Sequence, residues 1–365
     1  MKIFLQTYGC QMANRDSEVI IGFLIKEGYK IVDDDKKADV VIFNTCSVRQ
    51  HAEDRVFSAI GACHAKIIGV AGCMANNYRE AIFKKAPSVD FVIGTRDINK
   101  IPKIIKEIEK HKKNKQDKKI SETDAKFRED EIYHTGYHLT KDHAFVVISE
   151  GCENYCSYCI VPYVRGKFRS RSPEEIIKEI KDDIGAGISR ITLLGQNVNQ
   201  YKSNIDFKDL LYMVNKVEGL KQFDFMTSHP KDAIYALFKT MAECDKLIKH
   251  LHLPVQSGSN RILKSMNRGY TKEHYLGLVK KYRDIVKGGV ISTDIIVGFP
   301  GETEEDFKET YDLVKKVKFN KAYIFKYSPR PHTKALNFVD DVPKQEKERR
   351  HGLILDLQRE ISKKK

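Results

Sequence analysis

No apolar run in this sequence is long enough to cross a membrane, since none reaches the roughly 18 residues that a span needs. We expect no secretory leader either, because residues 1–7 are too short and too polar a stretch to act as one. Internal repeats of solenoid length are also absent. We therefore expect a cytoplasmic protein that has no membrane partner and is not built as a repeat array.

Acidic residues are in deficit. The chain has 50 Asp and Glu residues against 64 Lys and Arg residues, so its formal net charge is +14. One interpretation is a polyanionic partner such as a nucleic acid. The alternative is a lysine-rich background, because most of the excess is scattered lysine. Charge alone does not choose between these two interpretations.

Disulfide bonds are not expected, although the chain has eight cysteines. We expect a chain without an export signal to stay in a reducing compartment. Cysteines there serve as metal or cluster ligands, as redox groups, or as plain buried thiols.

The 365 residues are too many for one ordinary domain and suggest two or three. Short apolar runs alternate with amphipathic stretches in the first third of the chain. We predict strands at 2–7, 39–43, 66–71 and 89–93, and helices at 15–27, 50–63, 78–85 and 98–110. This order predicts an α/β domain over residues 1–112, with a doubly wound parallel sheet and helices on both faces.

A lysine-dense polar segment, residues 113–135, is predicted to be a solvated linker. A second βα series follows, with strands expected at 144–149, 190–194, 222–226, 250–253, 289–296 and 322–326. Six βα units are fewer than the eight of a closed barrel, so we predict a partial (β/α)6 barrel over residues 136–340. An amphipathic helix is expected within residues 341–365.

Three cysteines follow the first predicted barrel strand in a C-x3-C-x2-C spacing: Cys152, Cys156 and Cys159. The carboxyl ends of barrel strands are where such folds place their active sites. Three thiolates in one short loop can bind three corners of a [4Fe–4S] cluster, which leaves the fourth iron open to a substrate or cofactor. A structural zinc ion would need a fourth ligand, and no other cysteine lies nearby. The spacing therefore predicts a cluster.

Three further cysteines, Cys10, Cys46 and Cys73, each come just after a predicted strand of the first domain. The carboxyl ends of parallel strands lie along one edge of a sheet, where ligands bind. A second three-cysteine cluster is therefore natural there. The alternative is three small residues that stand at strand ends by coincidence. Cys63 and Cys244 lack this context and are interpreted as ordinary thiols.

Two barrel strands end in residues suited to contact a cofactor. Gly195, Gln196 and Asn197 follow the second strand, and Gln256 and Ser257 follow the fourth. Glycine permits close approach of the backbone, and side-chain amides can hydrogen-bond an amino-acid moiety. Each group can instead be a plain loop cap.

A basic run follows the C-x3-C-x2-C loop, and aromatic residues are interleaved with it. Its cations are Arg165, Lys167, Arg169 and Arg171. Such cations can hold RNA phosphates while the aromatics stack on an unstacked base. The alternative is a solvated basic strand.

These motifs carry a resemblance to a known family. The matching segments include TYGCQM (7–12), NTCSVR (44–49), GCMA (72–75), residues 151–165, LLGQNVN (193–199), HLPVQSGS (252–259) and residues 292–302. The chain resembles the radical S-adenosylmethionine methylthiotransferases over essentially its whole length. Its stretch 194–201 is similar to the branch that modifies N6-dimethylallyladenosine in tRNA.

The resemblance implies two [4Fe–4S] clusters, with Cys152, Cys156 and Cys159 holding the radical-generating one. Cys10, Cys46 and Cys73 would hold the auxiliary one. It implies methylthiolation of N6-dimethylallyladenosine at tRNA position 37, next to the anticodon, with two S-adenosylmethionine molecules per turnover. The implied partners are a tRNA anticodon stem-loop, an electron donor of the flavodoxin or ferredoxin type, and a sulfur donor.

The sequence departs from the family in three places. The stretch 57–73 is shorter than usual, and His332 stands where glycine is usual. The small C-terminal β-barrel that binds RNA in the family is expected to be absent, because the sequence stops after the helix that normally precedes it.

Alternative functions share the same cysteines. One is methylthiolation of threonylcarbamoyl-adenosine in tRNA, and another is methylthiolation of an aspartate in a ribosomal protein. A third is an iron–sulfur protein that binds RNA or senses redox state without turnover. Formation of 5′-deoxyadenosine would exclude the last.

Overall fold

A computed structural model describes residues 1–47, 50–124 and 128–364. The chain divides into two compact units. Unit 1 comprises residues 1–147, 163–166 and 178–188. Unit 2 comprises residues 148–162, 167–177 and 189–365, and residue 365 itself lies outside the described residues. Each unit is described by itself.

Unit 1 is built on a six-stranded sheet in the order β2-β1-β3-β4-β5-β6, and all of its pairs are parallel. The strands are β1 (Lys2–Tyr8), β2 (Lys30–Ile31), β3 (Val40–Thr45), β4 (Ile67–Gly72), β5 (Phe91–Ile93) and β6 (Ile120–Glu122). Every residue of β3 and β4 is buried. Continuous apolar runs of this kind form strands that are covered on both faces.

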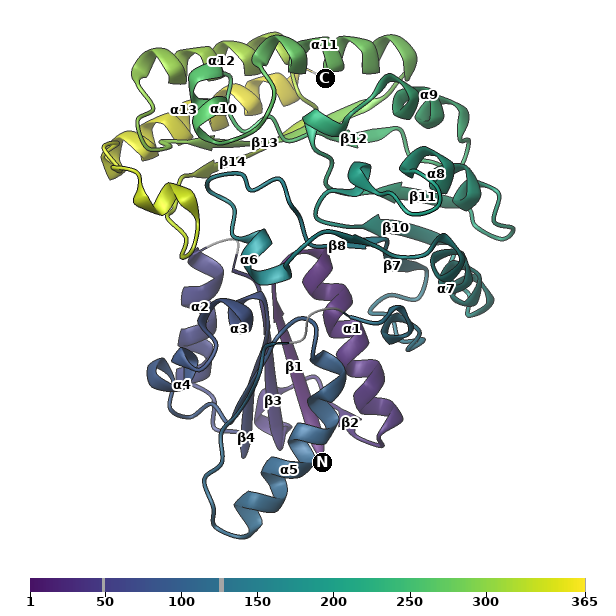
Figure 1. The fold of residues 1–365 in the computed structure, drawn as a ribbon, viewed down its shortest axis with the longest axis vertical. Coiled ribbons are helices and arrows are strands. Elements are labelled where there is room, and N and C mark those ends of the chain that lie inside the picture. Colours follow the sequence, from purple (N-terminus) through teal and green to yellow (C-terminus); the bar gives the residue numbers. More distant parts are fainter. Residues whose placement is uncertain (48–49, 125–127, 365) are drawn as a thin grey trace. The chain divides into compact units, whose positions relative to one another are not determined.

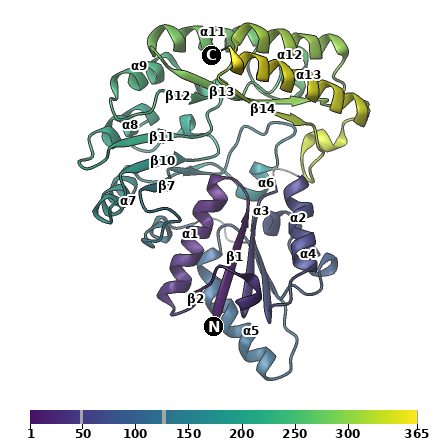
Figure 2. The same ribbon diagram turned by 180° about the vertical axis from the view of Figure 1, so that it is seen from behind.

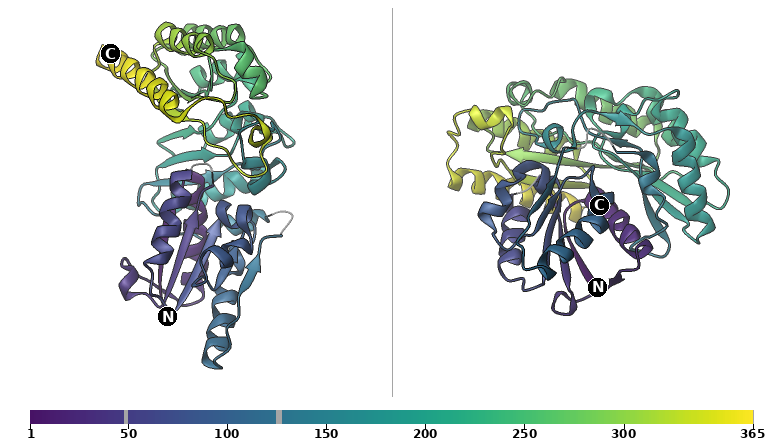
Figure 3. Two further views of the ribbon diagram at one scale, coloured as in Figure 1. Left: turned by 90° about the vertical axis from the view of Figure 1, so that its left-hand side faces the viewer. Right: turned by 60° about the horizontal axis from the view of Figure 1, so that its bottom comes forward.

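Helices provide that cover (Figure 1). They are α1 (Gln11–Lys26), α2 (Gln50–Gly61), α3 (Cys73–Tyr78), α4 (Ala81–Lys85) and α5 (Ile101–Lys113). One core cluster joins Val41 and Phe43 of β3 to Val56 of α2, Met74 of α3 and Ile82 of α4. Helix α1 packs with α5, and Figure 3 shows α1 running alongside the strands.

The segment predicted to be a linker contributes to this sheet. Residues 120–122 form β6, which pairs with β5. The linker prediction is wrong for this part, because a short edge strand with a single apolar residue gives no alternating pattern to detect. Residues 125–127 of the predicted linker lie outside the described part.

Unit 1 also contains a 3-10 turn (Asp130–Tyr133) and strand β7 (His143–Val147). These pieces meet a polar side of α1. Arg15 donates from Nη2 to the Tyr133 carbonyl oxygen at 2.7 Å and pairs with Glu179 at 2.9 Å. The Leu139 amide donates to Glu18 at 3.0 Å. Buried ions thus attach later segments of the chain to the first helix.

Unit 2 contains the βα series (Figure 2). It opens with β8 (Ser149–Glu150), which pairs antiparallel with β9 (Arg169–Ser170). The parallel strands are β10 (Arg190–Leu194), β11 (Gln222–Phe225), β12 (His250–His252), β13 (Val290–Val297) and β14 (Lys321–Lys326). β10 pairs with β11, β12 pairs with β13, and β13 pairs with β14. A single bridge from Phe223 of β11 to Leu247 links the two groups.

The helices of this series are α8 (Phe207–Asn215), α9 (Tyr235–Glu243), α10 (Asn260–Ser265), α11 (Lys272–Ile285), α12 (Glu304–Val317) and α13 (Lys344–Lys363). Two more, α6 (Val161–Arg165) and α7 (Pro173–Gly185), are divided between the units. The α/β fold class predicted from the sequence is confirmed. No helix of the described residues is both long and apolar enough to span a bilayer.

Candidate cluster and cofactor sites

The three N-terminal cysteines lie where neighbouring parallel strands end. The last residues of these strands are in register, with Tyr8 opposite Thr45 and Thr45 opposite Gly72. The cysteines follow at once: Cys10 is the N-cap of α1, Cys46 succeeds β3, and Cys73 opens α3. Register and connectivity therefore bring three thiols to one edge of the unit 1 sheet.

Two glycines make these turns possible. Gly72 has φ +94°, and a Cβ there would lie 2.5 Å from the Thr45 carbonyl oxygen. A Cβ on Gly9 would lie 2.3 Å from the Cβ of Ala13. Any other residue would move the turn that holds Cys10 or Cys73, because real side chains do not tolerate such approaches.

The thiols of this set influence one another, and two of them interact with one cation. A hydrogen bond from Cys46, aided by the Arg165 guanidinium and nearby backbone amides, lowers the pKa of Cys10 to about 6. Burial raises the pKa of Cys73, although Arg165 opposes that rise. Cys10 is exposed, while Cys46 and Cys73 are buried. The thiolate is the ligand form of cysteine, and these neighbours favour it at Cys10.

Arg165 has a role that the sequence did not predict. We expected it to bind RNA, but it is only 5% exposed and its Nε donates to Cys73 Sγ at 3.3 Å. Its Nη2 pairs with Asp16 at 2.6 Å. Asp16 and Cys73 lie in unit 1 with Arg165. These buried contacts contradict the expectation that the Arg165 side chain binds an RNA phosphate.

Of the other three basic residues of the run, one is buried and two reach the surface. Arg171 is fully buried, and its carbonyl accepts a hydrogen bond from the Tyr201 hydroxyl at 2.8 Å. A buried guanidinium is not available to phosphate, so that expectation is corrected too. Lys167 is exposed and Arg169 is half-buried, with Nη2 4.0 Å from Glu150 Oε2. Only these two of the four cations reach the surface.

The second cysteine set lies in the loop after β8. Cys152 and Cys156 are buried and Cys159 is half-buried. Burial, followed by the neighbouring Cys156, raises the pKa of Cys159 to about 12. Burial likewise raises the pKa of Cys152, and Cys156 adds to it. Cys156 thus disfavours ionisation of both other thiols, and the Arg268 guanidinium opposes this effect.

A segment after α10 holds this loop in place. The Ser157 amide donates to the Met266 carbonyl at 3.0 Å, and Asn267 donates to the Tyr155 carbonyl at 3.0 Å. Arg268 donates from Nη1 to Cys156 Sγ at 3.2 Å and from Nη2 to the Pro254 carbonyl at 2.9 Å. Sequence reasoning missed this segment. Its only signal is the turn-like Asn-Arg-Gly-Tyr at 267–270.

Residues at the end of β10 support the cysteine loop. The Gln196 side-chain oxygen accepts a hydrogen bond from the Gly151 amide at 2.5 Å. Asn197 is 1% exposed, and its Nδ2 donates to Asp232 at 2.7 Å. A Cβ on Gly195 would lie 2.4 Å from Ser149 Oγ, so glycine is required there. The side-chain amides of Gln196 and Asn197, which were expected to contact a cofactor, thus form these hydrogen bonds with other residues of the protein.

The loop after β12 is attached to α12. Gln256 is 7% exposed and has φ +70°, a strained backbone for a residue with a side chain. The Ser257 hydroxyl lies 3.2 Å from Thr310 Oγ1, and the Gly258 amide donates to the same oxygen at 2.9 Å. Ser257 is fully buried and serves to hold the loop.

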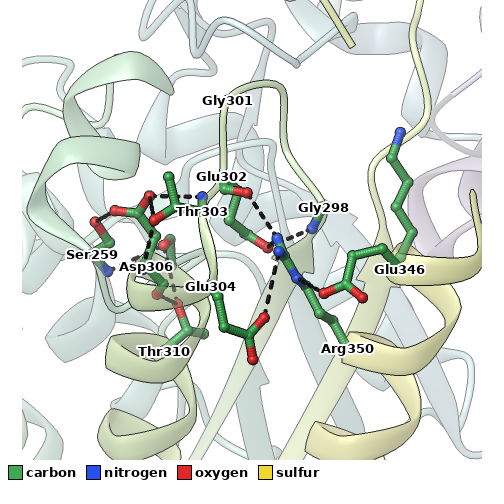
Figure 4. A network of polar contacts seen from close by, with 12 residues as sticks. Ser259, Gly298, Gly301, Glu302, Thr303, Glu304, Asp306, Thr310, Glu346 and Arg350 are labelled. Atoms are coloured by element: carbon green, nitrogen blue, oxygen red, sulfur yellow. Dashed lines mark hydrogen bonds and ion pairs between the residues drawn. The ribbon is translucent and has the colours of Figure 1, made fainter. Parts of the chain in front are cut away.

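Figure 4 shows the polar network that completes this attachment. Asp306 caps α12 in a capping box with Thr303 and accepts a hydrogen bond from Ser259 at 2.5 Å. On the other side, Glu302 accepts hydrogen bonds from the Gly298 amide and from Arg350 Nη1, each at 2.8 Å. The loops after β12 and β13 are thereby fixed to α12 and α13.

The donor sets fit iron–sulfur clusters. Each set has three thiols with a buried guanidinium on one of them. In the described part of the chain, no three His, Cys, Asp or Glu side chains form a group that would hold a single metal ion. Three thiolates can each bind one iron of a [4Fe–4S] cluster. A structural zinc ion needs four ligands at one point.

Comparison with known proteins agrees with this description. Residues 146–314 match the model of the Radical SAM superfamily, and residues 2–94 match the family model described as Uncharacterized protein family UPF0004. The solved structure of the radical S-adenosylmethionine methyltransferase TsrM from Kitasatospora setae, with cobalamin and a [4Fe–4S] cluster bound, covers 92% of this chain and 73% of its own, with a TM-score of 0.62 at 13% identity. The fold and site thus define a radical S-adenosylmethionine protein.

Closer relatives specify the family. A Clostridium botulinum (strain Langeland) tRNA-2-methylthio-N(6)-dimethylallyladenosine synthase is 46% identical over all of this chain and 83% of its own length. The synthase of Thermoanaerobacter sp. (strain X514) is 47% identical over 98% of this chain and 78% of its own length. The chain belongs to the family of tRNA-2-methylthio-N(6)-dimethylallyladenosine synthases.

Proposed function

We propose that this chain adds a methylthio group to N6-dimethylallyladenosine at position 37 of tRNA and consumes two S-adenosylmethionine molecules per turnover. The observation that carries the proposal is the combination of two three-thiol sites with relatives of that name that match all or nearly all of this chain. Those relatives modify tRNA, which also supports the cytoplasm as the location. Methylthiolation of threonylcarbamoyl-adenosine or of a ribosomal-protein aspartate is not favoured.

Six cysteines would hold two [4Fe–4S] clusters. Cys152, Cys156 and Cys159 would hold the cluster that binds S-adenosylmethionine, and Cys10, Cys46 and Cys73 would hold the auxiliary cluster. When bound, these groups supply the one-electron chemistry needed to replace an unactivated C–H bond, which no acid–base pair performs at neutral pH. An external electron donor of the flavodoxin or ferredoxin type and a sulfur donor would complete the reaction.

The protein's own residues do the positioning. Gln196 fixes Gly151 at the start of the cysteine loop, and Arg268 fixes Cys156 within it. We propose that Gly195, Gln196, Asn197, Gln256 and Ser257 form a wall against the cofactor, chiefly by holding their backbones in place. Lys167 and Arg169, the two cations of the run that reach the surface, would contact tRNA phosphates.

The test is reconstitution of the full chain with two tRNA substrates. One carries N6-dimethylallyladenosine at position 37 and the other carries threonylcarbamoyl-adenosine there. We expect mass spectrometry of digested nucleosides to show the methylthio product only from the first. Product only from the second, or only from a ribosomal protein, would refute the proposed substrate. Absence of 5′-deoxyadenosine would refute the proposed reaction class.

A further inference from the structure

We infer that Arg165 is a positioning residue that sets the reduction potential of the auxiliary cluster by a charged hydrogen bond to its ligand Cys73. The inference rests on the proposed function, because it requires a cluster at Cys10, Cys46 and Cys73. It goes beyond the proposed function because it assigns to Arg165 an effect on the cluster's reduction potential in place of a contact with RNA.

The contact itself has the required geometry. Arg165 Nε lies 3.3 Å from Cys73 Sγ, within hydrogen-bond range for sulfur, and both residues are buried. A guanidinium is always charged, and its donors have a fixed planar arrangement. The hydrogen bond to sulfur is therefore charge-assisted and directional.

A buried carboxylate holds the guanidinium in this orientation. Asp16 Oδ2 pairs with Arg165 Nη2 at 2.6 Å, and Asp16 Oδ1 pairs with Arg128 Nη1 at 2.9 Å. Asp16 is fully buried between these two cations. Because the guanidinium is planar, the ion pair of Asp16 with Nη2 of Arg165 orients Nε of the same group toward Cys73. Arg96 adds a third constraint by donating to the Arg165 carbonyl oxygen.

The Arg165 guanidinium contacts a cysteine sulfur directly, whereas Arg128 contacts Asp16. Reduction adds an electron to a cluster, and nearby positive charge stabilises the reduced state. Hydrogen bonds to ligand sulfur act in the same direction, because they withdraw electron density from the thiolate. Arg165 should therefore raise the potential.

The experiment uses the full chain with Cys152, Cys156 and Cys159 replaced by alanine, so that only the auxiliary cluster remains. Arg165→Gln, Arg165→Lys and Arg128→Gln are made in this parent. Iron content and an EPR-monitored redox titration are measured for each. Arg128→Gln is the matched control, since it removes the other partner of Asp16 without touching a sulfur.

We expect Arg165→Gln to retain its iron and to be reduced at a more negative potential. A tenfold change in the reduction equilibrium corresponds to about 59 mV for one electron, and we expect a shift of at least that size. Arg165→Lys should lie between the parent and Arg165→Gln, because it keeps the charge but loses the fixed geometry. Arg128→Gln should shift much less.

Every outcome decides a separate point. A parent without iron would refute the auxiliary cluster, and the inference would fall with it. A parent with iron and an unshifted Arg165→Gln would overturn the inference alone. Equal shifts in Arg165→Gln and Arg128→Gln, or loss of iron in both, would also overturn it, since Arg165 would then act only through the fold. Loss of iron in Arg165→Gln alone would overturn it as well, since Arg165 would then be needed to hold the cluster and not to set its potential. Weaker tRNA binding without any change at the cluster would identify Arg165 as a phosphate contact and overturn it.

Discussion

Single residues at the two sulfur sites are arranged by the same rule. Each thiol set has one buried arginine that donates to a cysteine, Arg165 to Cys73 and Arg268 to Cys156. Their other partners differ. Arg165 is paired with a carboxylate, whereas Arg268 meets the Pro254 carbonyl and the hydroxyls of two tyrosines. Besides Cys156, Arg268 thus contacts neutral oxygens, whereas Arg165 contacts an ionised carboxylate, so the two cysteine sites have different electrostatic surroundings.

The strained backbone of Gln256 allows a separation of fold from function. We expect Gln256→Gly to relieve about 1 kcal/mol of left-handed strain, and Gln256→Ala to keep it. If the residue's amide contacts the cofactor, both variants should raise the KM for S-adenosylmethionine by about tenfold, the loss of roughly one hydrogen bond. Urea unfolding and steady-state kinetics check the two parts.

The result that would contradict this prediction is an unchanged KM in both variants. Gln256 would then serve the fold only, through the hydrogen bonds of its backbone to Asp294 and Ile296. A lower urea midpoint for Gln256→Gly than for Gln256→Ala would contradict the strain argument instead.

At the scale of elements, the N-terminus of α12 is the clearest target. Burial alone would raise the pKa of Asp306, but hydrogen bonds from Arg261, Ser259 and Thr303 lower it to about 2. Because the folded pKa lies below the unfolded value of 3.8, the ionised side chain stabilises the fold fully above about pH 4. This stabilisation disappears as the pH falls toward 2.

We therefore predict that Asp306→Asn lowers the free energy of unfolding by about 2 kcal/mol, from the lost cap and charged hydrogen bonds. Urea denaturation at several pH values between 5 and 8 should give the same loss throughout, since the carboxylate is ionised in both states there. Asp312→Asn, at an exposed position of the same helix, is the control and should change little. A loss that grows or shrinks across this pH range would argue against the lowered pKa.

Elements also show how far the sequence could predict the fold. Strong apolar runs were found nearly at their true bounds, as with 40–45 and 67–72. Strand β6 and helices α3 and α10 were missed because they are short and their residues are fixed by tertiary contacts. The C-x3-C-x2-C spacing was enough to single out Cys152, Cys156 and Cys159 as candidates. Cys10, Cys46 and Cys73 were candidates because each follows a predicted parallel strand, and such strands end at one edge of the sheet. The roles of Arg165 and Arg268 could not be predicted, because the sequence alone does not distinguish a buried arginine from one on the surface.

At the scale of the whole molecule, the two cysteine sets belong to different units of the chain. Replacement of Cys152, Cys156 and Cys159 by alanine should leave about half of the iron, held by the other set. The matching replacement of Cys10, Cys46 and Cys73 should leave the other half. Iron analysis of anaerobic preparations checks both. A preparation that keeps all of its iron after the first change would contradict the assignment of that loop.

Asp16 also bears on when the auxiliary site can form during synthesis. The ribosome delivers Asp16 early, but its partners Arg128 and Arg165 emerge more than 100 residues later. Domains generally fold as units from the N-terminus during synthesis. Here the first sheet can assemble early, yet Asp16 gains Arg128 and then Arg165 as partners only later in synthesis. We therefore expect the proposed auxiliary site at Cys10, Cys46 and Cys73 to reach its final form only after residue 165 has been synthesised.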